Sequence, residues 1–218
     1  LAHILESVYF CGNSYFCSDQ TFIPRFETEL LVSVVSDYIQ HHFSENISFN
    51  SLELGLGTGV ISLELARRFK YGYFYGWEKS SSVYSVAQKN LNYYEFDNCT
   101  FYNQDFFNDE LIWRRFLLEG KHNVFVSNPP YIPASDIETL DATVRCNEPH
   151  LALNGGDGGL DYYRRLFKLF QDSSVVQFYE IGIDQKDSLS DLLKGFGYEH
   201  FSFVNDQQDI PRVLSVLG

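Results

Sequence analysis

The strongest constraint on the fold is an alternation of short apolar runs with longer amphipathic stretches, which continues from residue 50 to the end of the chain. Apolar runs of this length are typical of buried parallel strands, and the stretches between them have helical periodicity. We expect strands at 50–54, 73–77, 99–103, 123–127, 175–180, 199–204 and 212–217, and helices at 59–69, 80–93, 109–118, 161–171 and 185–194. This order predicts an α/β fold with a largely parallel sheet covered by helices on both faces.

The two ends of the chain depart from this alternation. Residues 7–18 predict a short N-terminal β-hairpin that turns at Gly12-Asn13. Residues 27–42 place apolar side chains on one helical face, so we expect a helix there. No helical stretch separates the last two predicted strands, which predicts an antiparallel C-terminal hairpin.

Composition sets limits on partners and location. The 218 residues suit one α/β domain, or one domain plus a small appendage. A net charge of −13 argues against nonspecific binding to phosphate backbones, so we expect no direct nucleic-acid partner. No apolar run approaches the ~20 residues that a membrane span needs, and no signal pattern opens the chain. We expect a cytoplasmic protein, a monomer, with no membrane partner.

The cysteines do not indicate a metal site. Cys11, Cys17, Cys99 and Cys146 lack zinc-type spacing, and we expect them to stay reduced, although Cys11 and Cys17 could face each other across the hairpin. We predict no metal. The sequence contains no methionine, so we expect that Leu1 is an internal residue or that methionines are missing from the sequence as given.

The stretch "LELGLGTGV" (52–60) follows the first strand of the alternation and opens a helix. Gly55, Gly57 and Gly59 allow a tight turn and a close backbone approach, and a helix N-terminus offers N–H groups to an electron-rich ligand. The spacing differs from a dinucleotide fingerprint, which would have its third glycine where Val60 stands. A turn without a ligand is the alternative.

Two further strand ends carry acidic residues. Glu78 can accept hydrogen bonds from both hydroxyls of a ribose, as NAD enzymes also do, or it can be a solvated charge. Asp105 could accept an adenine amino proton while Phe106 lies along the ring; a helix N-cap is the alternative role for Asp105.

Asn128, Pro129, Pro130 and Tyr131 follow the fourth strand of the alternation and form the most specific motif. The prolines have no N–H and a fixed φ, so the segment makes a rigid corner that mainly offers acceptors. A planar NH2 group whose two N–H bonds point at the Asn128 oxygen and the Pro129 carbonyl would turn its lone pair toward an electrophile. Beside an adenosine-shaped site, this corner suggests methyl transfer from S-adenosylmethionine to a conjugated nitrogen. An ordinary proline-rich turn is the alternative.

The motif resembles the N/D-P-P-Y/F signature of the amino-methyltransferase superfamily, and longer blocks are similar to one family within it. "FIPRFETELLV" (22–32), "NEPHLALNGGDGGLDYYRRL" (147–166), "EIGIDQ" (180–185) and "DIPRVLSV" (209–216) resemble, in order, the release-factor glutamine methyltransferases of the HemK/PrmC type. Phe26 stands where this family usually has proline, a change that the first helical turn should tolerate.

The resemblance implies a seven-stranded, Rossmann-like class I methyltransferase fold. It implies transfer of methyl from S-adenosylmethionine, leaving S-adenosylhomocysteine, to the side-chain amide nitrogen (N5) of the glutamine in the Gly-Gly-Gln loop of peptide-chain release factors. The family's domains would divide the chain into a hairpin linker, 1–24, that follows a missing N-terminal helical domain, and a catalytic domain, 25–218.

The resemblance also implies roles for individual residues. Cofactor contacts are expected from Glu53, Gly55, Leu56, Gly57, Thr58, Gly59, Glu78, Lys79, Asp105, Phe106 and Asn128. Catalysis and substrate binding are expected at Asn128, Pro129, Pro130 and Tyr131, with Arg25 as a further substrate contact. Arg25, Glu27 and Glu29 can equally be helix-entry charges, and Glu148, Pro149 and Asp161 are expected to shape the substrate loop.

Three other functions stay open at this point. Glutamine methylation of a large-subunit ribosomal protein is a close alternative. N6-adenine methylation of nucleic acid shares the motif but needs a positive surface. A noncatalytic cofactor-binding module would not need the intact Asn-Pro-Pro-Tyr corner.

Overall fold

The computed structural model describes residues 2–45, 47–119, 122–141, 144–145 and 148–217. The chain begins with α1 (Ala2–Leu5), β1 (Ser7–Phe10), β2 (Asn13–Phe16) and α2 (Phe26–His42). The central part contains β3 (Phe49–Leu54), α3 (Val60–Arg68), β4 (Gly72–Trp77), α4 (Ser81–Tyr94), β5 (Cys99–Tyr102), the 3-10 turn η1 (Phe106–Asn108), α5 (Glu110–Glu119) and β6 (Asn123–Ser127). The last part contains η2 (Ile137–Thr139), α7 (His150–Leu153), η3 (Asp157–Gly159), α8 (Asp161–Phe170), β7 (Val176–Glu180), α9 (Lys186–Gly195), β8 (Phe201–Asn205) and β9 (Pro211–Val216).

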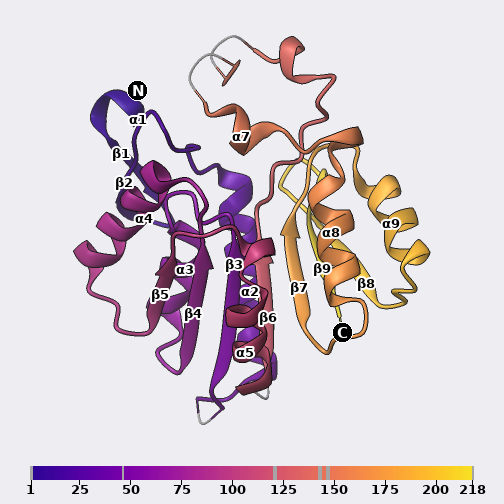
Figure 1. Cartoon of the computed structure of the whole chain (residues 1–218), viewed down its shortest axis with the longest axis horizontal. Coiled ribbons are helices and arrows are strands. Elements are labelled where there is room, and N and C mark those ends of the chain that lie inside the picture. Colours follow the sequence, from indigo (N-terminus) through magenta and orange to yellow (C-terminus); the bar gives the residue numbers. More distant parts are fainter. Residues whose placement is uncertain (1, 46, 120–121, 142–143, 146–147, 218) are drawn as a thin grey trace.

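The main sheet has seven strands in the order β5-β4-β3-β6-β7-β9-β8 (Figure 1). Only β9 runs antiparallel to its neighbours, β7 and β8, so the predicted parallel sheet and C-terminal hairpin are confirmed. The chain order reverses between β3 and β6, since β4 and β5 lie on one side of this pair and β7 on the other. Ligands of such sheets bind beyond the carboxyl ends of the strands at this reversal.

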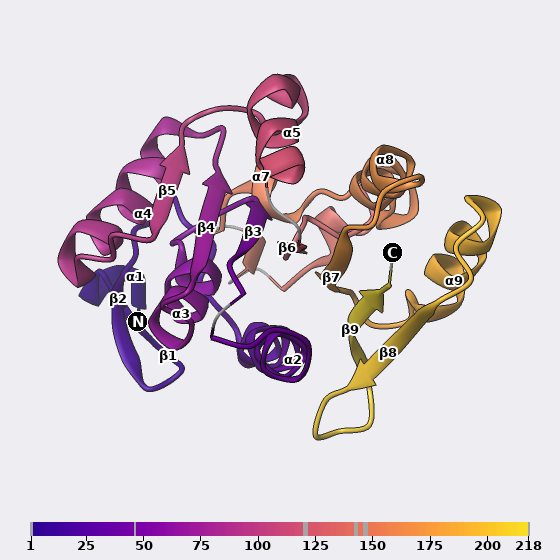
Figure 2. The ribbon, with the colours of Figure 1, turned by 90° about the horizontal axis from the view of Figure 1, so that it is seen from below.

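Two hydrophobic cores lie on the two faces of the sheet. Val124 and Val126 of β6 pack in the first core, which lies against α2, α3 and α4. Phe125 between them packs in the second core, which includes α8 and α9. Figure 2 shows α2 and α3 on one side of the strands and α5 and α8 on the other. Alternate residues of a strand face opposite sides, so a strand buried on both faces tends to be a continuous apolar run, as Val124 to Val126 of β6 are.

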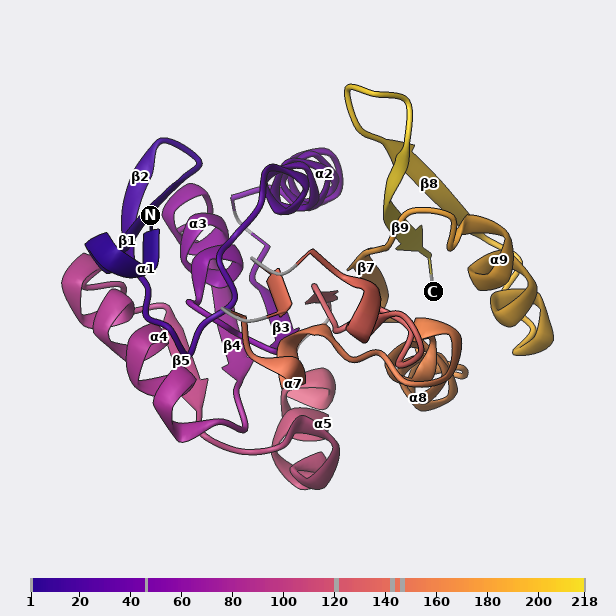
Figure 3. The same cartoon turned by 90° about the horizontal axis from the view of Figure 1, so that it is seen from above.

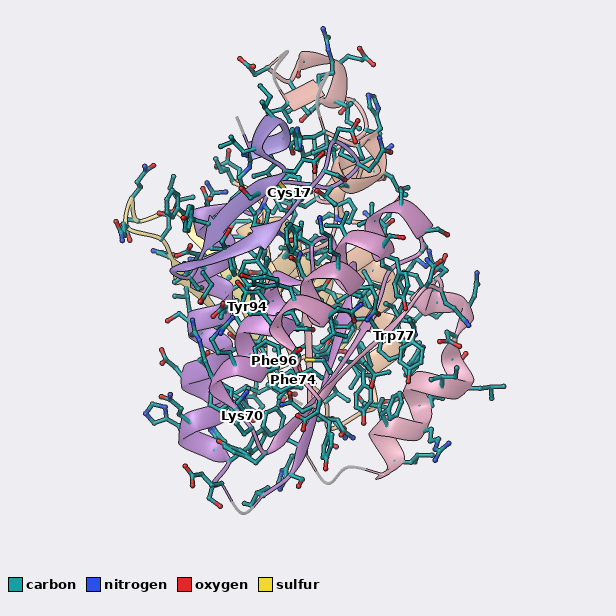
Figure 4. The ribbon with its side chains drawn as sticks, turned by 90° about the vertical axis from the view of Figure 1, so that its left-hand side faces the viewer. Cys17, Lys70, Phe74, Trp77, Tyr94 and Phe96 are labelled. Atoms are coloured by element: carbon teal, nitrogen blue, oxygen red, sulfur yellow. The ribbon has the colours of Figure 1, made fainter. Side chains whose placement is uncertain are left out.

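The flank beside β4 and α4 is closed by aromatic rings and cations (Figure 4). The rings of Tyr94 and Phe96 stack with centroids 5.9 Å apart. Lys70 Nζ lies 4.5 Å from the Phe96 centroid, and the Arg67 guanidinium lies 4.5 Å from that of Tyr94. These cation–π contacts cover the edge of the first core with groups that water can reach.

The N-terminal hairpin is confirmed, but its predicted turn is wrong by one residue. Phe10 pairs with Asn13, so Cys11 and Gly12 form the turn, with φ of 48° and 78°. Two positive φ values are those of a type I′ turn, the form that matches strand twist. Asn13 lies in β2 instead, where its side chain donates to Glu64 Oε1 at 2.9 Å.

Cys11 and Cys17, which could have faced each other across the hairpin, do not pair. Cys11 lies in the turn, and Cys17 donates its backbone N–H to the carbonyl of Glu6. Cys11, Cys17 and Cys99 are free thiols, while Cys146 lies outside the described residues, as does Asn147 of the "NEPH" block. Within the described ranges, no helix has both the length and the apolar character needed to cross a bilayer.

The long segment after β6 lies beyond the carboxyl ends of the strands, where Figure 3 shows α7 over the middle of the sheet. The regular structure among its described residues comes in short pieces, as expected, and includes η2, α7, η3 and a parallel bridge between Ile132 and Asn154. The segment thus forms a cover over the end of the sheet where ligands are expected.

Candidate active site

A cavity of about 380 Å³ opens at the carboxyl ends of β3, β4 and β6. Its volume lies within the usual range for small-molecule sites. Twelve of the residues predicted to form the site line it, namely Gly55, Leu56, Gly57, Thr58, Glu78, Lys79, Asp105, Phe106, Asn128, Pro129, Pro130 and Tyr131. Glu53, Gly59 and Arg25 were also predicted, but the cavity lining does not include them.

The glycine-rich turn forms one wall. Gly55 and Gly57 have φ of 76° and 55°, and a Cβ added to either would meet no atom within 4 Å. Their backbone therefore faces open space, which lets a ligand approach more closely than any side chain would allow. The N–H groups of Gly55 and Leu56 both donate to the Trp77 carbonyl, at 3.0 and 3.2 Å, so β4 fixes the shape of the turn.

Glu53 lies beneath the turn and is fully buried. Leu52 and Leu54 face the second core, so Glu53 faces α3, where its Oε2 accepts hydrogen bonds from the backbone N–H and the hydroxyl of Ser62. Gly59 precedes α3 and has no side chain to cap it, and Glu53 supplies that acceptor from the strand. Burial raises the pKa of Glu53 to about 8. The geometry gives Glu53 a structural role under the turn instead of a place in the cavity wall.

Glu78 connects the two sides of the predicted cofactor site. Its Oε2 accepts from the Gly57 N–H at 3.3 Å, and its Oε1 accepts from the Ser80 N–H at 2.9 Å. Burial raises the pKa of its carboxyl group, whereas these two N–H groups favour the charged form. Glu78 is thus held at the end of β4 as an oriented acceptor, as expected for a group that binds hydroxyls.

Asp105 and Phe106 differ in part from their predicted geometry. Asp105 lines the cavity and also accepts from the Phe107 N–H at 3.0 Å, so its alternative role as an N-cap holds as well. The Phe106 ring stacks on Trp113 with centroids 5.2 Å apart, and the residue is 2% exposed. The ring is therefore part of the core, and little of it is free to lie along a ligand. Phe107, with the Arg165 guanidinium 3.5 Å from its centroid, is the more open ring beside the cavity.

The acceptor corner after β6 is held from behind. Asn128 Nδ2 donates to Thr28 Oγ1 at 3.3 Å, so the Oδ1 atom is the end of the carboxamide turned away from Thr28. Tyr131 donates its hydroxyl to Glu180 Oε1 at 3.2 Å, and Gln185 Nε2 donates to the Tyr131 carbonyl at 3.0 Å. A rigid loop with fixed acceptors can recognise a planar donor without rearranging.

Arg25 forms an ion pair with Glu148, whose side chain is 5% exposed. This pair joins the start of α2 to the segment that covers the cavity, since Pro149, which immediately follows Glu148, lines the cavity. Burial raises the pKa of Glu148, and the Arg25 charge opposes that shift. Arg25 is thus engaged with the segment that covers the cavity, and its contact with substrate stays a prediction.

Pro149, expected to shape the substrate loop, lines the cavity, but most of the segment over the cavity and the outer rim was not predicted residue by residue. The lining residues that were not predicted are Gln20, Phe22, Pro24, Thr28, Leu54, Val60, Ile61, Trp77, Ser80, Val83, Gln104, Phe107, Ile132, Leu151, Ala152, Leu153, Tyr162 and Arg165. The block at 22–32 and the block at 147–166 contain many of them, so the family-like segments were the available signal.

The residues fit an adenosine cofactor. The open glycine backbone and the oriented Glu78 carboxylate suit the sugar, and Asp105 stands where an exocyclic amino group could donate. Among the described residues, no group of three or more His, Cys, Asp or Glu side chains could hold a metal ion.

Comparisons with known proteins identify the family. Residues 28–156 match the model of the methyltransferase small domain. The chain is 35% identical to the release factor glutamine methyltransferase of Bacillus anthracis over 98% of this chain and 75% of that protein. It is 29% identical to the protein of the same name from Geobacter sulfurreducens, over 98% of this chain and 72% of the relative.

Solved structures confirm the fold. The human METTL16 catalytic domain, crystallised with a MAT2A 3′UTR hairpin, matches with a TM-score of 0.71 at 14% identity, covering 94% of this chain and 76% of that one. The N-terminal domain of human METTL16 in complex with SAH matches with a TM-score of 0.63 at 16% identity, covering 90% and 72%. Likeness at this identity concerns the fold alone. The sequence relatives carry the assignment further: this chain is a methyltransferase and belongs to the release factor glutamine methyltransferase family.

Proposed function

We propose that this enzyme transfers a methyl group from S-adenosylmethionine to the side-chain amide nitrogen of the glutamine in the Gly-Gly-Gln loop of peptide-chain release factors. One observation carries the proposal: the Asn128 to Tyr131 corner lines the same cavity as the glycine turn and Glu78. A site for an adenosine cofactor and a set of acceptors for a planar NH2 group therefore share one space. The name of the relative from Bacillus anthracis supports the choice of substrate.

The cofactor would supply an electrophilic methyl group when bound. Gly55, Leu56, Gly57 and Thr58 would hold it through the backbone of the turn, and Glu78 through the ribose hydroxyls. Asp105 would receive the adenine amino group, with Lys79 at the same rim. These residues position the cofactor and take no part in bond formation.

The corner would activate the amide nitrogen. An amide NH2 is a poor nucleophile because its lone pair is delocalised into the carbonyl group. Hydrogen bonds from its two N–H groups to Asn128 Oδ1 and to the Pro129 carbonyl would stabilise positive charge as it develops on nitrogen. No strong general base is needed, since the N–H proton becomes acidic once the nitrogen is alkylated. Tyr131 would pack against the flat amide.

Two alternatives within the same chemistry remain as arms of the test. Methylation of a glutamine in a large-subunit ribosomal protein would use the same corner. N6-adenine methylation would also use it, but a net charge of −13 disfavours a nucleic-acid substrate.

The experiment measures transfer of labelled methyl from S-adenosylmethionine to four acceptors: release factor, release factor with the loop glutamine changed to alanine, a large-subunit ribosomal protein preparation and duplex DNA. Label on the first acceptor alone supports the proposal. Label on DNA or on the ribosomal preparation, with none on release factor, overturns the assigned substrate.

Because translation termination takes place in the cytoplasm, we also propose that this enzyme is located there. The division of the chain into a hairpin linker, 1–24, and a catalytic domain, 25–218, stays a prediction.

A further inference from the structure

A buried carboxylate stands behind the acceptor corner. Glu180, at the end of β7, is 1% exposed and does not belong to the cavity lining. Its Oε2 accepts the hydroxyl proton of Thr28 at 2.6 Å, and its Oε1 accepts the hydroxyl proton of Tyr131 at 3.2 Å. An acid is costly to bury, so its position against two residues of the site calls for an explanation beyond packing.

Thr28 links Glu180 to Asn128 by two hydrogen bonds, and in each bond only one partner can be the donor. A threonine hydroxyl has one proton, and Thr28 donates it to the Glu180 carboxylate. Toward Asn128, Thr28 can then offer only a lone pair. The Nδ2 group of Asn128 donates to this lone pair on Thr28 Oγ1, at 3.3 Å. The two ends of a carboxamide have nearly the same shape, so this chain of donors decides which end faces Thr28.

The direction matters for the reaction proposed above, on which this inference rests. A substrate NH2 group is a donor and needs Oδ1 of Asn128 as its acceptor. With the carboxamide reversed, Nδ2 would face the substrate, and two donors would oppose each other. We infer that Glu180 and Thr28 are positioning residues that set the amide orientation of Asn128, and thereby keep its acceptor end toward the methyl-accepting nitrogen.

Protonation of Glu180 would remove this preference. A neutral carboxyl group can donate to Thr28, and Thr28 can then donate its own proton to Oδ1 of a reversed Asn128. Burial raises the pKa of Glu180 to about 7, so this change falls in a testable range. The charged and titratable groups around Glu180 are Glu27 on α2, Tyr131 in the corner, Tyr163 on α8 and Arg212 on β9. Of these, Arg212 favours the charged carboxylate and Glu27 disfavours it.

The first test compares three variants of α2. Thr28→Val keeps the shape but removes the relay, Thr28→Ser keeps the hydroxyl, and Ser36→Ala removes a buried hydroxyl that donates to Val32 within the same helix. We expect Thr28→Val to lower kcat for release factor by about 10- to 100-fold, with cofactor Kd within about threefold of wild type. Thr28→Ser and Ser36→Ala should retain kcat. Equal kcat for Thr28→Val and wild type overturns the inference.

The second test uses pH and does not require Thr28→Val to fold. Wild-type kcat should fall as pH decreases through about 7, and Glu180→Gln, which cannot ionise, should lack this acid limb between about pH 6 and pH 8. An unchanged acid limb in Glu180→Gln overturns the inference. Failure of the proposed function looks different: wild type would then leave release factor unlabelled at every pH.

Discussion

Asn90 of α4 donates from Nδ2 to the Thr58 carbonyl at 2.9 Å, which joins a buried helix residue to the turn of the cofactor site. The same side chain holds the hairpin: Nδ2 also donates to the Phe16 carbonyl at 2.9 Å, and Oδ1 accepts from the Phe16 N–H at 2.7 Å. Asn90 is fully buried. One carboxamide therefore connects β2, 74 residues away in the chain, to the glycine-rich turn.

Replacing Asn90 by alanine should loosen both partners. One buried backbone group at Thr58 and two partly buried ones at Phe16 would lose their hydrogen-bond partner, so we expect a loss of about 2–4 kcal/mol in unfolding free energy and about tenfold weaker cofactor binding. Urea unfolding and calorimetry with S-adenosylmethionine measure the two effects. Asn92→Ala, at an exposed position of the same helix, is the control and should change neither. Normal cofactor affinity in a destabilised Asn90→Ala variant would show that the turn does not depend on this contact.

Asn128→Ala should separate chemistry from cofactor binding. Loss of one acceptor for the reacting nitrogen is expected to lower kcat by about 100- to 1000-fold, while cofactor affinity stays within about threefold because the glycine turn and Glu78 are intact. Steady-state methylation of release factor and calorimetry measure these quantities. The matched control is Asn98→Ala: Asn98 is a buried asparagine that donates to the carbonyls of Phe69 and Gly72, so its loss should lower stability and leave kcat unchanged. Parallel loss of kcat and cofactor affinity in Asn128→Ala would mean that the corner is structural.

Glu53 predicts a pH dependence of stability. Its pKa is about 8 in the folded protein, against an ordinary value of 4.5, so the folded state holds a proton that the unfolded state has released. The stability that this proton contributes is fully present below pH 4.5 and is lost as pH rises to about 8. Glu53→Gln mimics the neutral acid at every pH. Above pH 8 we expect the unfolding free energy of the variant to exceed that of wild type by about 5 kcal/mol, and near pH 4.5 the two should agree.

The measurement is urea unfolding at several pH values across this window. Glu180 also has a raised pKa and contributes a slope of the same sign, so the difference between variant and wild type is the quantity that reports on Glu53. A difference that does not change with pH would contradict the prediction.

The fold could be predicted from the sequence because both faces of the sheet are buried. Such strands are continuous apolar runs, and the corners that follow them contain the chemistry: Gly55 to Thr58, Glu78 and the Asn128 corner all line the cavity. Alternation along β3 could also have placed Glu53 under α3, since its neighbours Leu52 and Leu54 share the opposite face.

Other features depend on contacts that local pattern does not encode. The hairpin turn lies at Cys11 and Gly12, one residue before the predicted position, and Asn13 instead contacts Glu64 on α3 from β2. Phe106 lines the cavity as predicted, but its ring is stacked on Trp113 in the core, which leaves little of it open to a ligand. Both outcomes are set by partners brought in by the tertiary fold, and neighbouring residues in the sequence carry no sign of them.

Two adjacent glycines offer a matched test of how firmly the acceptor corner must be held. Gly158 and Gly159 have φ of 59° and 72°, so alanine at either position is strained by a similar amount, about 1 kcal/mol. The surroundings differ. A Cβ at Gly159 would lie 2.1 Å from the Tyr131 carbonyl oxygen and 2.7 Å from Gln185 Nε2, whereas a Cβ at Gly158 would come no nearer than 4.0 Å, to Leu160 Cδ1.

Gly159→Ala should therefore displace Tyr131 and break its hydrogen bond from Gln185, with kcat lower by about tenfold or more. Gly158→Ala should cost a similar backbone strain and keep kcat. Methylation rates and thermal unfolding of both variants check this. If the two variants lose kcat equally, the effect comes from backbone strain in the loop and not from the position of Tyr131. If Gly159→Ala keeps kcat, the corner tolerates movement that the proposed recognition of a planar amide does not allow.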